Sequence, residues 1–134
     1  VTDVQIDEAF CDFLVGIPVQ RLANLRELKK KYNIYLLSNT NSIMWNSRIA
    51  EEFKKEGLVR DDYFDGIITS FEAKSIKPEI EIFDFAKKKL NILPNETLFL
   101  DDSQKNLDAS SQLGFKTLLV KPGDDFYELL KTYL

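Results

Sequence analysis

Short apolar runs alternate with longer amphipathic segments along most of the chain. The apolar runs are too short for helices but long enough for buried strands. The segments between them carry apolar residues at helical spacing. Strands that alternate with helices of this length predict a parallel sheet covered by helices on both faces, that is, a Rossmann-like three-layer α/β/α fold. The predicted strands cover residues 34–37, 67–70, 97–100 and 116–120, and the main predicted helices begin near residues 18, 43, 78, 102 and 124.

The first residues show a different pattern. Thr2 and Gln5 have the spacing of a capping box, which predicts a short helix over residues 2–14. Gly16-Ile17-Pro18 should end it, and Pro18 suits the first turn of the next helix.

Composition narrows the class of protein. The 134 residues are 44% hydrophobic and 30% charged, which is typical of a soluble domain with a real core. A net charge of −4 argues against nucleic acid as the main partner, and no stretch reaches the ~18 apolar residues of a membrane span. The single cysteine, Cys11, has no partner for a disulfide, so we expect a cytoplasmic protein. Because the chain has no histidine, catalysis would have to use carboxylates, lysine, hydroxyls and a hard cation.

Polar residues end three of the four predicted strands, at Ser38, at Ser70 and at Asp101-Asp102. In such sheets ligands bind beyond the carboxyl ends of the strands. Two adjacent carboxylates repel each other and lose hydration, and a bound cation relieves both problems. Mg²⁺ fits, because it takes one or two carboxylates together with waters and phosphate oxygens. The alternative is that Asp102 or Ser103 simply caps the next helix.

Two further residues could bind an anion. The hydroxyl of Ser38 and the backbone N–H groups of Asn39 and Thr40 could together bind an anion. The alternative is an ordinary polar loop after a strand. Lys77 precedes Pro78 and therefore lies in extended backbone just before a predicted helix, where it would add positive charge. The alternative for Lys77 is a solvent-exposed side chain.

The order of these features along the chain resembles motifs two to four of the haloacid dehalogenase (HAD) superfamily. The matching segments are "IYLLSNTN", "SIKPEIEIFDFAKKKL" and "TLFLDDSQKNLDASSQLGFKTLLV". The resemblance covers residues 17–134, which would form the HAD-like core. By resemblance only, residues 1–16 would be the remnant of a helical cap.

The resemblance implies a role for each matching residue. Ser38 would donate a hydrogen bond to a phosphoryl oxygen, and Asn39 would add a contact through its backbone. Lys77 would neutralise the phosphoryl group and the attacking carboxylate. Asp101 and Asp102 would hold Mg²⁺, with Asp102 as the direct ligand, and Asn106 would orient Asp102.

One family feature is missing from the sequence. The family's first motif is a strand that ends in Asp-x-Asp, whose first aspartate attacks phosphorus, and this chain has no Asp-x-Asp. In the family that strand is central, between the strands that end here at Ser38 and Asp101. We therefore expect a core whose central first strand is missing, with a gap or a repacked sheet in its place. The strand would be supplied by an N-terminal segment of a longer protein or by a second copy of the chain. A smaller departure is Lys74, where relatives commonly have glycine.

The leading hypothesis is a magnesium-dependent hydrolase of small phosphorylated metabolites, acting through a phosphoaspartate in the intact protein. The 134-residue chain alone should be inactive, because it lacks the nucleophile. A dehalogenase fits the acidic pair and lysine less well, and a phosphomutase stays open. The main alternative is a non-catalytic module that binds phosphate or a protein. A plain α/β domain would require three coincidental motif matches.

Overall fold

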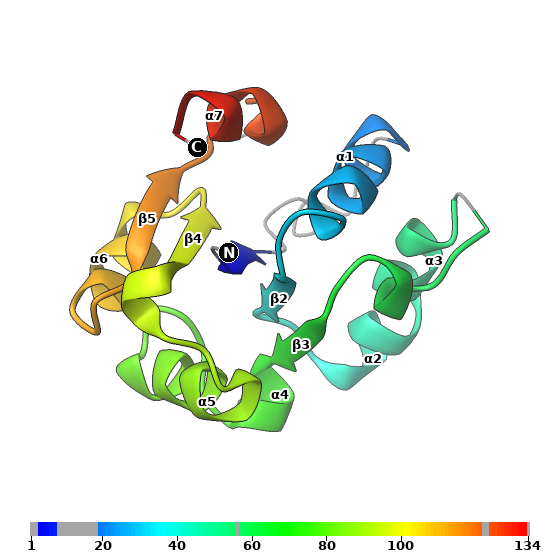
Figure 1. The fold of residues 1–134 in the computed structure, drawn as a ribbon. Helices are drawn as coiled ribbons and strands as arrows, with labels where there is room; N and C mark the ends of the chain where they lie inside the picture. Colours follow the sequence, from blue (N-terminus) through cyan, green and yellow to red (C-terminus); the bar gives the residue numbers. More distant parts are fainter. Residues whose placement is uncertain (1–2, 8–18, 56, 122–123, 134) are drawn as a thin grey trace.

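The centre of the molecule is a parallel five-stranded sheet with the order β3-β2-β1-β4-β5 (Figure 1). The computed structural model describes residues 3–7, 19–55, 57–121 and 124–133. All four pairs of neighbouring strands run parallel. The strands are β1 (Asp3–Asp7), β2 (Ile34–Ser38), β3 (Gly66–Thr69), β4 (Thr97–Asp101) and β5 (Lys116–Leu119).

Helices cover both faces of this sheet. On one face, α1 and α7 pack against Ile34 and Leu36 of β2, and on the other, α5 and α6 pack against Tyr35 and Leu37. Successive residues of β2 thus enter opposite layers of the core, as the pleat of a strand requires. The predicted three-layer α/β/α fold is confirmed. The helices are α1 (Val19–Lys29), α2 (Ser42–Asn46), α3 (Arg48–Phe53), α4 (Ser70–Ala73), α5 (Ile80–Leu90), α6 (Gln104–Ser111) and α7 (Phe126–Tyr133), with short 3-10 helices η2 (Arg60–Asp62) and η3 (Pro94–Glu96).

The first described segment corrects two expectations. Residues 3–7 form the strand β1, so the predicted helix over residues 2–14 is wrong for this part. The central position of the sheet is also not empty, because β1 lies between β2 and β4 and pairs with both. A strand in that position lets β2 and β4 satisfy backbone groups that a gap would leave unpaired. The assignment of residues 1–16 to a cap stays a prediction, and Cys11 lies outside the described residues.

The helix predicted to begin near residue 43 is instead two short helices. α2 ends at Asn46 and α3 begins at Arg48. The hydroxyl of Ser47, between them, donates to the carbonyl of Ile43 at 2.6 Å. A serine that hydrogen-bonds back to the carbonyl four residues earlier tends to bend a helix. This local hydrogen bond accounts for the break.

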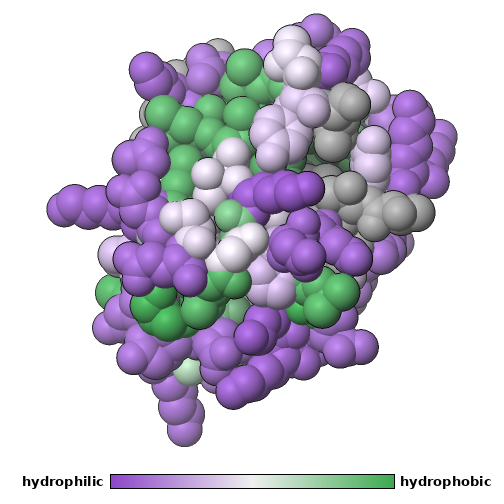
Figure 2. All heavy atoms as spheres, turned by 60° about the vertical axis from the view of Figure 1, so that its left-hand side comes forward, coloured by the Kyte–Doolittle hydropathy of each residue, from purple (hydrophilic) through white to green (hydrophobic). Residues whose placement is uncertain are grey.

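The edge strand β5 is not fully covered by helices. Thr117, Leu118 and Leu119 of β5 stay partly exposed. Figure 2 turns the β5 side of the molecule forward and shows hydrophobic surface there between hydrophilic side chains. No helix in the described part of the chain is long and apolar enough to cross a membrane.

Candidate active site

The carboxyl ends of β2 and β4 place Ser38 and Asp101 at the same edge of the sheet, on either side of β1. Ser38 is the last residue of β2 and Asp101 the last residue of β4. Both are almost completely buried, with 0% and 2% of their surfaces exposed. Because the strands are parallel, their carboxyl ends meet at one edge. The two polar strand ends predicted from the sequence therefore face a common region.

Lys77 reaches the same region from the turn between α4 and α5. Its side chain is only 2% exposed, and its Nζ lies 3.7 Å from Oδ2 of Asp101. The ammonium also donates to the carbonyl of Leu37, the residue before Ser38, at 3.3 Å. The alternative of a solvent-exposed Lys77 is wrong. The structure thus brings an ammonium and a carboxylate that lie far apart in the sequence together at the end of the strand that carries Ser38.

The hydroxyl of Ser38 has no hydrogen-bond partner among the described residues, although it is buried. A buried polar group without a partner costs roughly 1–3 kcal/mol. A ligand oxygen at the edge of the sheet would remove that cost. A hydroxyl of this kind, one residue after the carbonyl that accepts from Lys77, fits a small oxyanion.

The carboxylate of Asp101 is held by α6. Its Oδ1 accepts from the backbone N–H of Ser103 at 3.1 Å, and its Oδ2 accepts from the Asn106 side-chain amide at 2.7 Å. The sequence predicted that Asn106 orients Asp102, and the structure shows its amide donating to Asp101 instead. Asn106 lies one turn into α6, whose N-cap is Ser103, so its amide points back to the strand end rather than to the loop.

Asp102 is half-buried directly after β4. Ser103, not Asp102, is the N-cap of α6, and its hydroxyl accepts from the backbone N–H of Asn106. Capping by Asp102 is therefore wrong, whereas capping by Ser103 is confirmed.

The acidic pair is a small donor set for a metal. Among the described residues, no three His, Cys, Asp or Glu side chains form a group that could hold an ion. Mg²⁺ needs fewer protein ligands, because waters and phosphate oxygens complete its shell. Asp101 accepts two hydrogen bonds and faces Lys77, so other groups already hold its carboxylate in place. The chemistry of the pair fits Mg²⁺.

Asn39 enters the site in a way that the sequence did not predict. Its Oδ1 accepts from the backbone N–H of Lys77 at 2.9 Å, and its Nδ2 donates to the carbonyl of Lys77 at 3.2 Å. The predicted contact of its backbone with phosphate stays a prediction. No local pattern marks the side-chain contact, because its two residues are 38 positions apart.

Ser70 and Glu79 shape the surrounding loops through contacts that the sequence did not predict. The hydroxyl of Ser70 donates to the carbonyl of Thr40 at 2.7 Å and accepts from its N–H at 2.9 Å, so it joins the loops after β2 and β3. The Glu79 carboxylate accepts from Ile76 N–H at 2.9 Å and from the Ser75 hydroxyl at 2.8 Å. These two hydrogen bonds, that from Ile76 first, lower the pKa of Glu79. Both residues organise backbone rather than offer groups to a ligand.

Comparison with known proteins agrees with this arrangement. The family model of the haloacid dehalogenase-like hydrolases matches residues 5–114. The chain belongs to this family.

Three relatives show how far the similarity extends. A D-ribitol-5-phosphate phosphatase of Bacteroides thetaiotaomicron is 34% identical over 134 residues, which are 100% of this chain and 65% of that protein. A HAD family enzyme of the same species, solved in complex with magnesium and inorganic phosphate, is 40% identical with a TM-score of 0.82, over 86% of this chain and 58% of that one. A predicted HAD-like hydrolase of Porphyromonas gingivalis is 27% identical with a TM-score of 0.81, over 89% of this chain and 58% of that one. The chain spans less than two thirds of the length of these relatives.

Proposed function

We propose that this haloacid dehalogenase-like hydrolase is, in its intact form, a magnesium-dependent phosphatase of a small phosphorylated metabolite. The observation that carries the proposal is the buried ion pair of Lys77 with Asp101, together with the buried hydroxyl of Ser38, which has no partner among the described residues and directly follows the Leu37 carbonyl that accepts from Lys77. A phosphoryl group has oxygens for the hydroxyl and negative charge for the ammonium. The relatives' phosphatase activity and bound magnesium and phosphate support the same reading.

Each residue has a role in this proposal. Ser38 donates to a phosphoryl oxygen, and Lys77 neutralises charge on the phosphoryl group and on the attacking carboxylate. Asp101 and Asp102 hold Mg²⁺, which when bound offsets negative charge on the phosphate. Asn106 and Ser103 keep the Asp101 carboxylate in place. Fixed charges of this kind act without reorganising during the reaction, which is the main source of rate enhancement in such sites.

The attacking carboxylate is the group that the 134 residues do not supply as an Asp-x-Asp motif. We propose that it comes from a segment upstream in a longer protein, or from a second copy of the chain, and that the 134-residue chain alone is inactive. The carboxylate attacks phosphorus, the bond from phosphorus to the leaving oxygen breaks, and water then hydrolyses the phosphoaspartate. Its required position is the carboxyl end of the central strand, between Ser38 and Asp101.

In this structure that position belongs to β1, whose last residue is Asp7. The variant Asp7→Asn therefore tests the origin of the nucleophile. If the 134-residue chain releases phosphate and Asp7→Asn abolishes the release, Asp7 is the nucleophile and the proposed inactivity is wrong. If the chain is inactive and only the longer protein turns over, the upstream origin is supported.

The function itself is tested by phosphate release from a panel of sugar and polyol phosphates that includes D-ribitol 5-phosphate. The longer protein should be active with Mg²⁺ and lose activity with a chelator. Lys77→Met and Ser38→Ala should each abolish activity, whereas Lys116→Met, an exposed lysine on the edge strand β5, should not. Activity that persists in Lys77→Met would contradict the proposal.

A second candidate is a module that binds phosphate or a protein without turnover. The observation that favours it is the presence of Ser38 and Lys77 in a chain that lacks Asp-x-Asp. Binding of inorganic phosphate by the longer protein, together with no hydrolysis of any phosphate ester, would support it. A cytoplasmic location stays a prediction.

A further inference from the structure

The side chain of Asn39 makes two hydrogen bonds to the backbone of Lys77, one to its N–H and one to its C=O. Its oxygen accepts from the N–H of Lys77 at 2.9 Å, and its nitrogen donates to the C=O of Lys77 at 3.2 Å. Only a carboxamide offers a donor and an acceptor side by side in one plane. The pair of hydrogen bonds therefore restricts the two backbone angles from which the lysine side chain starts.

These two hydrogen bonds come from the residue directly after Ser38, which carries the buried hydroxyl without a partner among the described residues. Leu37 accepts from the Lys77 ammonium at 3.3 Å, Ser38 carries the orphaned hydroxyl, and Asn39 holds the Lys77 backbone. Three consecutive residues thus fix both ends of Lys77 and place the hydroxyl between those contacts in sequence. A movement of Lys77 relative to Ser38 has to break at least one of these hydrogen bonds.

A buried lysine needs such support. Its four-carbon stem has several rotatable bonds, and ordering a long side chain of this kind opposes burial. The Lys77 side chain is nevertheless 2% exposed, with its ammonium 3.7 Å from Asp101. A fixed backbone reduces the number of arrangements from which that position must be selected.

The turn that bears Lys77 is ordered within itself by another residue. Glu79 accepts from Ser75 and Ile76, and the Glu79 N–H donates to the carbonyl of Ile76 at 2.8 Å. These contacts shape the turn but do not connect it to β2. The side chain of Asn39 connects the backbone of the turn to the end of β2, so its loss should loosen the turn without unfolding it.

We infer that Asn39 is a positioning residue: its carboxamide locks the Lys77 turn to the Ser38 loop, so that ammonium and hydroxyl face a phosphoryl oxygen as a preformed pair. The consequence for catalysis rests on the proposed phosphatase function, whereas the lock itself is a property of the folded chain. The two parts are therefore tested separately.

The lock is tested without any substrate by acetylating the lysines of the folded chain and measuring each site by mass spectrometry. Lys77 should react slowly in the unmodified chain, and exposed Lys74 serves as the internal reference. Asn39→Ala removes both hydrogen bonds and should raise the Lys77 rate about tenfold or more relative to Lys74. Asn95→Ala, at an exposed position in η3 before β4, is the matched control and should change nothing. A Lys77 that stays as protected in Asn39→Ala as in the unmodified chain overturns the inference.

A second variant keeps the test decisive if Asn39→Ala does not fold, which circular dichroism would show. Asn39→Asp retains the acceptor for the Lys77 N–H, replaces the donor to its carbonyl by a second acceptor oxygen and adds a negative charge. We expect a folded protein with a smaller rise in Lys77 acetylation, about threefold. No rise in a folded Asn39→Asp would likewise contradict the lock.

The catalytic consequence is measured in the longer protein. A positioning role predicts that Asn39→Ala lowers kcat about a hundredfold with a smaller change in KM, because misplaced charge costs most where charge develops in the reaction. Raised acetylation of Lys77 in a protein without phosphatase activity would sink the proposed function but leave the lock intact. An active enzyme whose kcat and Lys77 acetylation are both unchanged by Asn39→Ala would sink the lock and leave the function intact.

Discussion

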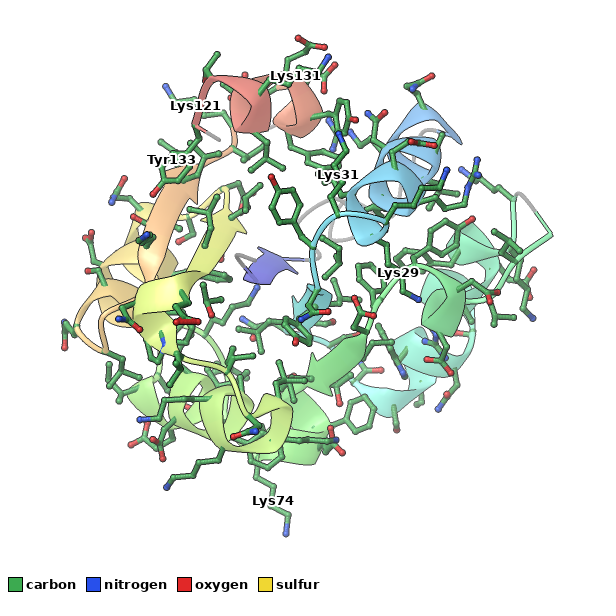
Figure 3. The ribbon with its side chains drawn as sticks, in the orientation of Figure 1. Lys29, Lys31, Lys74, Lys121, Lys131 and Tyr133 are labelled. Carbon is green, nitrogen blue, oxygen red and sulfur yellow. The ribbon has the colours of Figure 1, made fainter. Side chains whose placement is uncertain are left out.

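The ion pair at the carboxyl end of the sheet differs from the ion pairs on the helix surfaces in its burial, although its two charges lie farther apart. The surface pair of Lys88 with Asp84 on α5 is 2.8 Å long, and that of Lys131 with Glu128 on α7 is 3.0 Å. The pair of Lys77 with Asp101 is longer, at 3.7 Å, but its two side chains are 2% and 0% exposed. Figure 3 shows Lys131 on the outside of α7. Water screens the surface charges, whereas the buried charges depend on each other.

The comparison teaches that burial decides what a charged residue does here. On the surface an ion pair adds little stability and can be removed with little effect. At the carboxyl end of the sheet, the loss of Lys77 or Asp101 would leave the other as an unpaired buried charge. The protein therefore has a buried ion pair that is costly to break where a phosphoryl group would bind, and exposed ion pairs that add little stability elsewhere.

The largest expected effect comes from removing one partner of the buried pair. Lys77→Met should lower the free energy of unfolding by about 3 kcal/mol, because Asp101 would then be buried without its counter-charge. Urea unfolding of the two proteins measures the difference. The double variant Lys77→Met/Asp101→Asn should recover part of the loss. A change below about 1 kcal/mol in the single variant would contradict the dependence of the two charges on each other.

Ser38→Ala should act in the opposite direction on stability. The Ser38 hydroxyl is buried without a partner among the described residues, so its removal should raise the free energy of unfolding by about 1 kcal/mol. The same change should abolish binding of inorganic phosphate, measured by calorimetry in the longer protein. A site kept for binding at the expense of stability predicts both results together. A loss of stability would instead mean that the hydroxyl has a structural role.

Lys74→Gly should stabilise the fold by a smaller amount. Lys74 ends α4 with a φ of 56° and a ψ of 36°, a left-handed conformation that is unfavourable for a residue with a side chain. Figure 3 shows its side chain pointing away from the molecule, so little else is lost with it. We expect a gain of about 0.5–1 kcal/mol after the greater freedom of glycine in the unfolded chain is subtracted. Lys74→Ala, which keeps a β-carbon, is the matched control and should show no such gain in thermal unfolding.

The smallest effect should come from the surface pair on α5. The hydrogen bond from Lys88 is the main reason that the pKa of Asp84 is lowered. A carboxylate with a lowered pKa in the folded state stabilises the fold above its ordinary pKa, and this contribution disappears as the pH falls through the folded value. Lys88→Ala should therefore leave Tm nearly unchanged at pH 7 and slightly weaken the loss of Tm on acidification. A large drop of Tm at neutral pH would break the contrast with the buried pair.

The sequence predicted the layers better than it predicted the contacts at the site. The strands β2 to β5 were readable because each is a short apolar run between amphipathic segments, and the buried rows of β2 and β4 follow from that pattern. The strand β1 was not, because Thr2 and Gln5 have the spacing of a helix cap and the extended form of β1 depends on pairing with β2 and β4. A conformation that depends on pairing with distant strands cannot be predicted from the local sequence.

The site shows the same division. Ser38, Lys77 and Asp101 could be found because polar residues end apolar strands or precede a proline. The hydrogen bonds of Asn39 to Lys77 and of Asn106 to Asp101 could not be found, because each depends on how a helix or loop returns to the sheet. Chemistry-bearing residues are thus visible in the pattern, whereas the residues that hold them in place become visible only in the fold.

The most direct test of the central claim is Mg²⁺-dependent phosphate release by the longer protein from small phosphorylated metabolites, compared between the unmodified protein and Lys77→Met. The account predicts activity that needs Mg²⁺ and falls at least about a hundredfold in the variant, because one fixed charge at such a site is worth that much in rate. Equal activity in the two proteins, or no phosphate release from any ester in the panel, would contradict it.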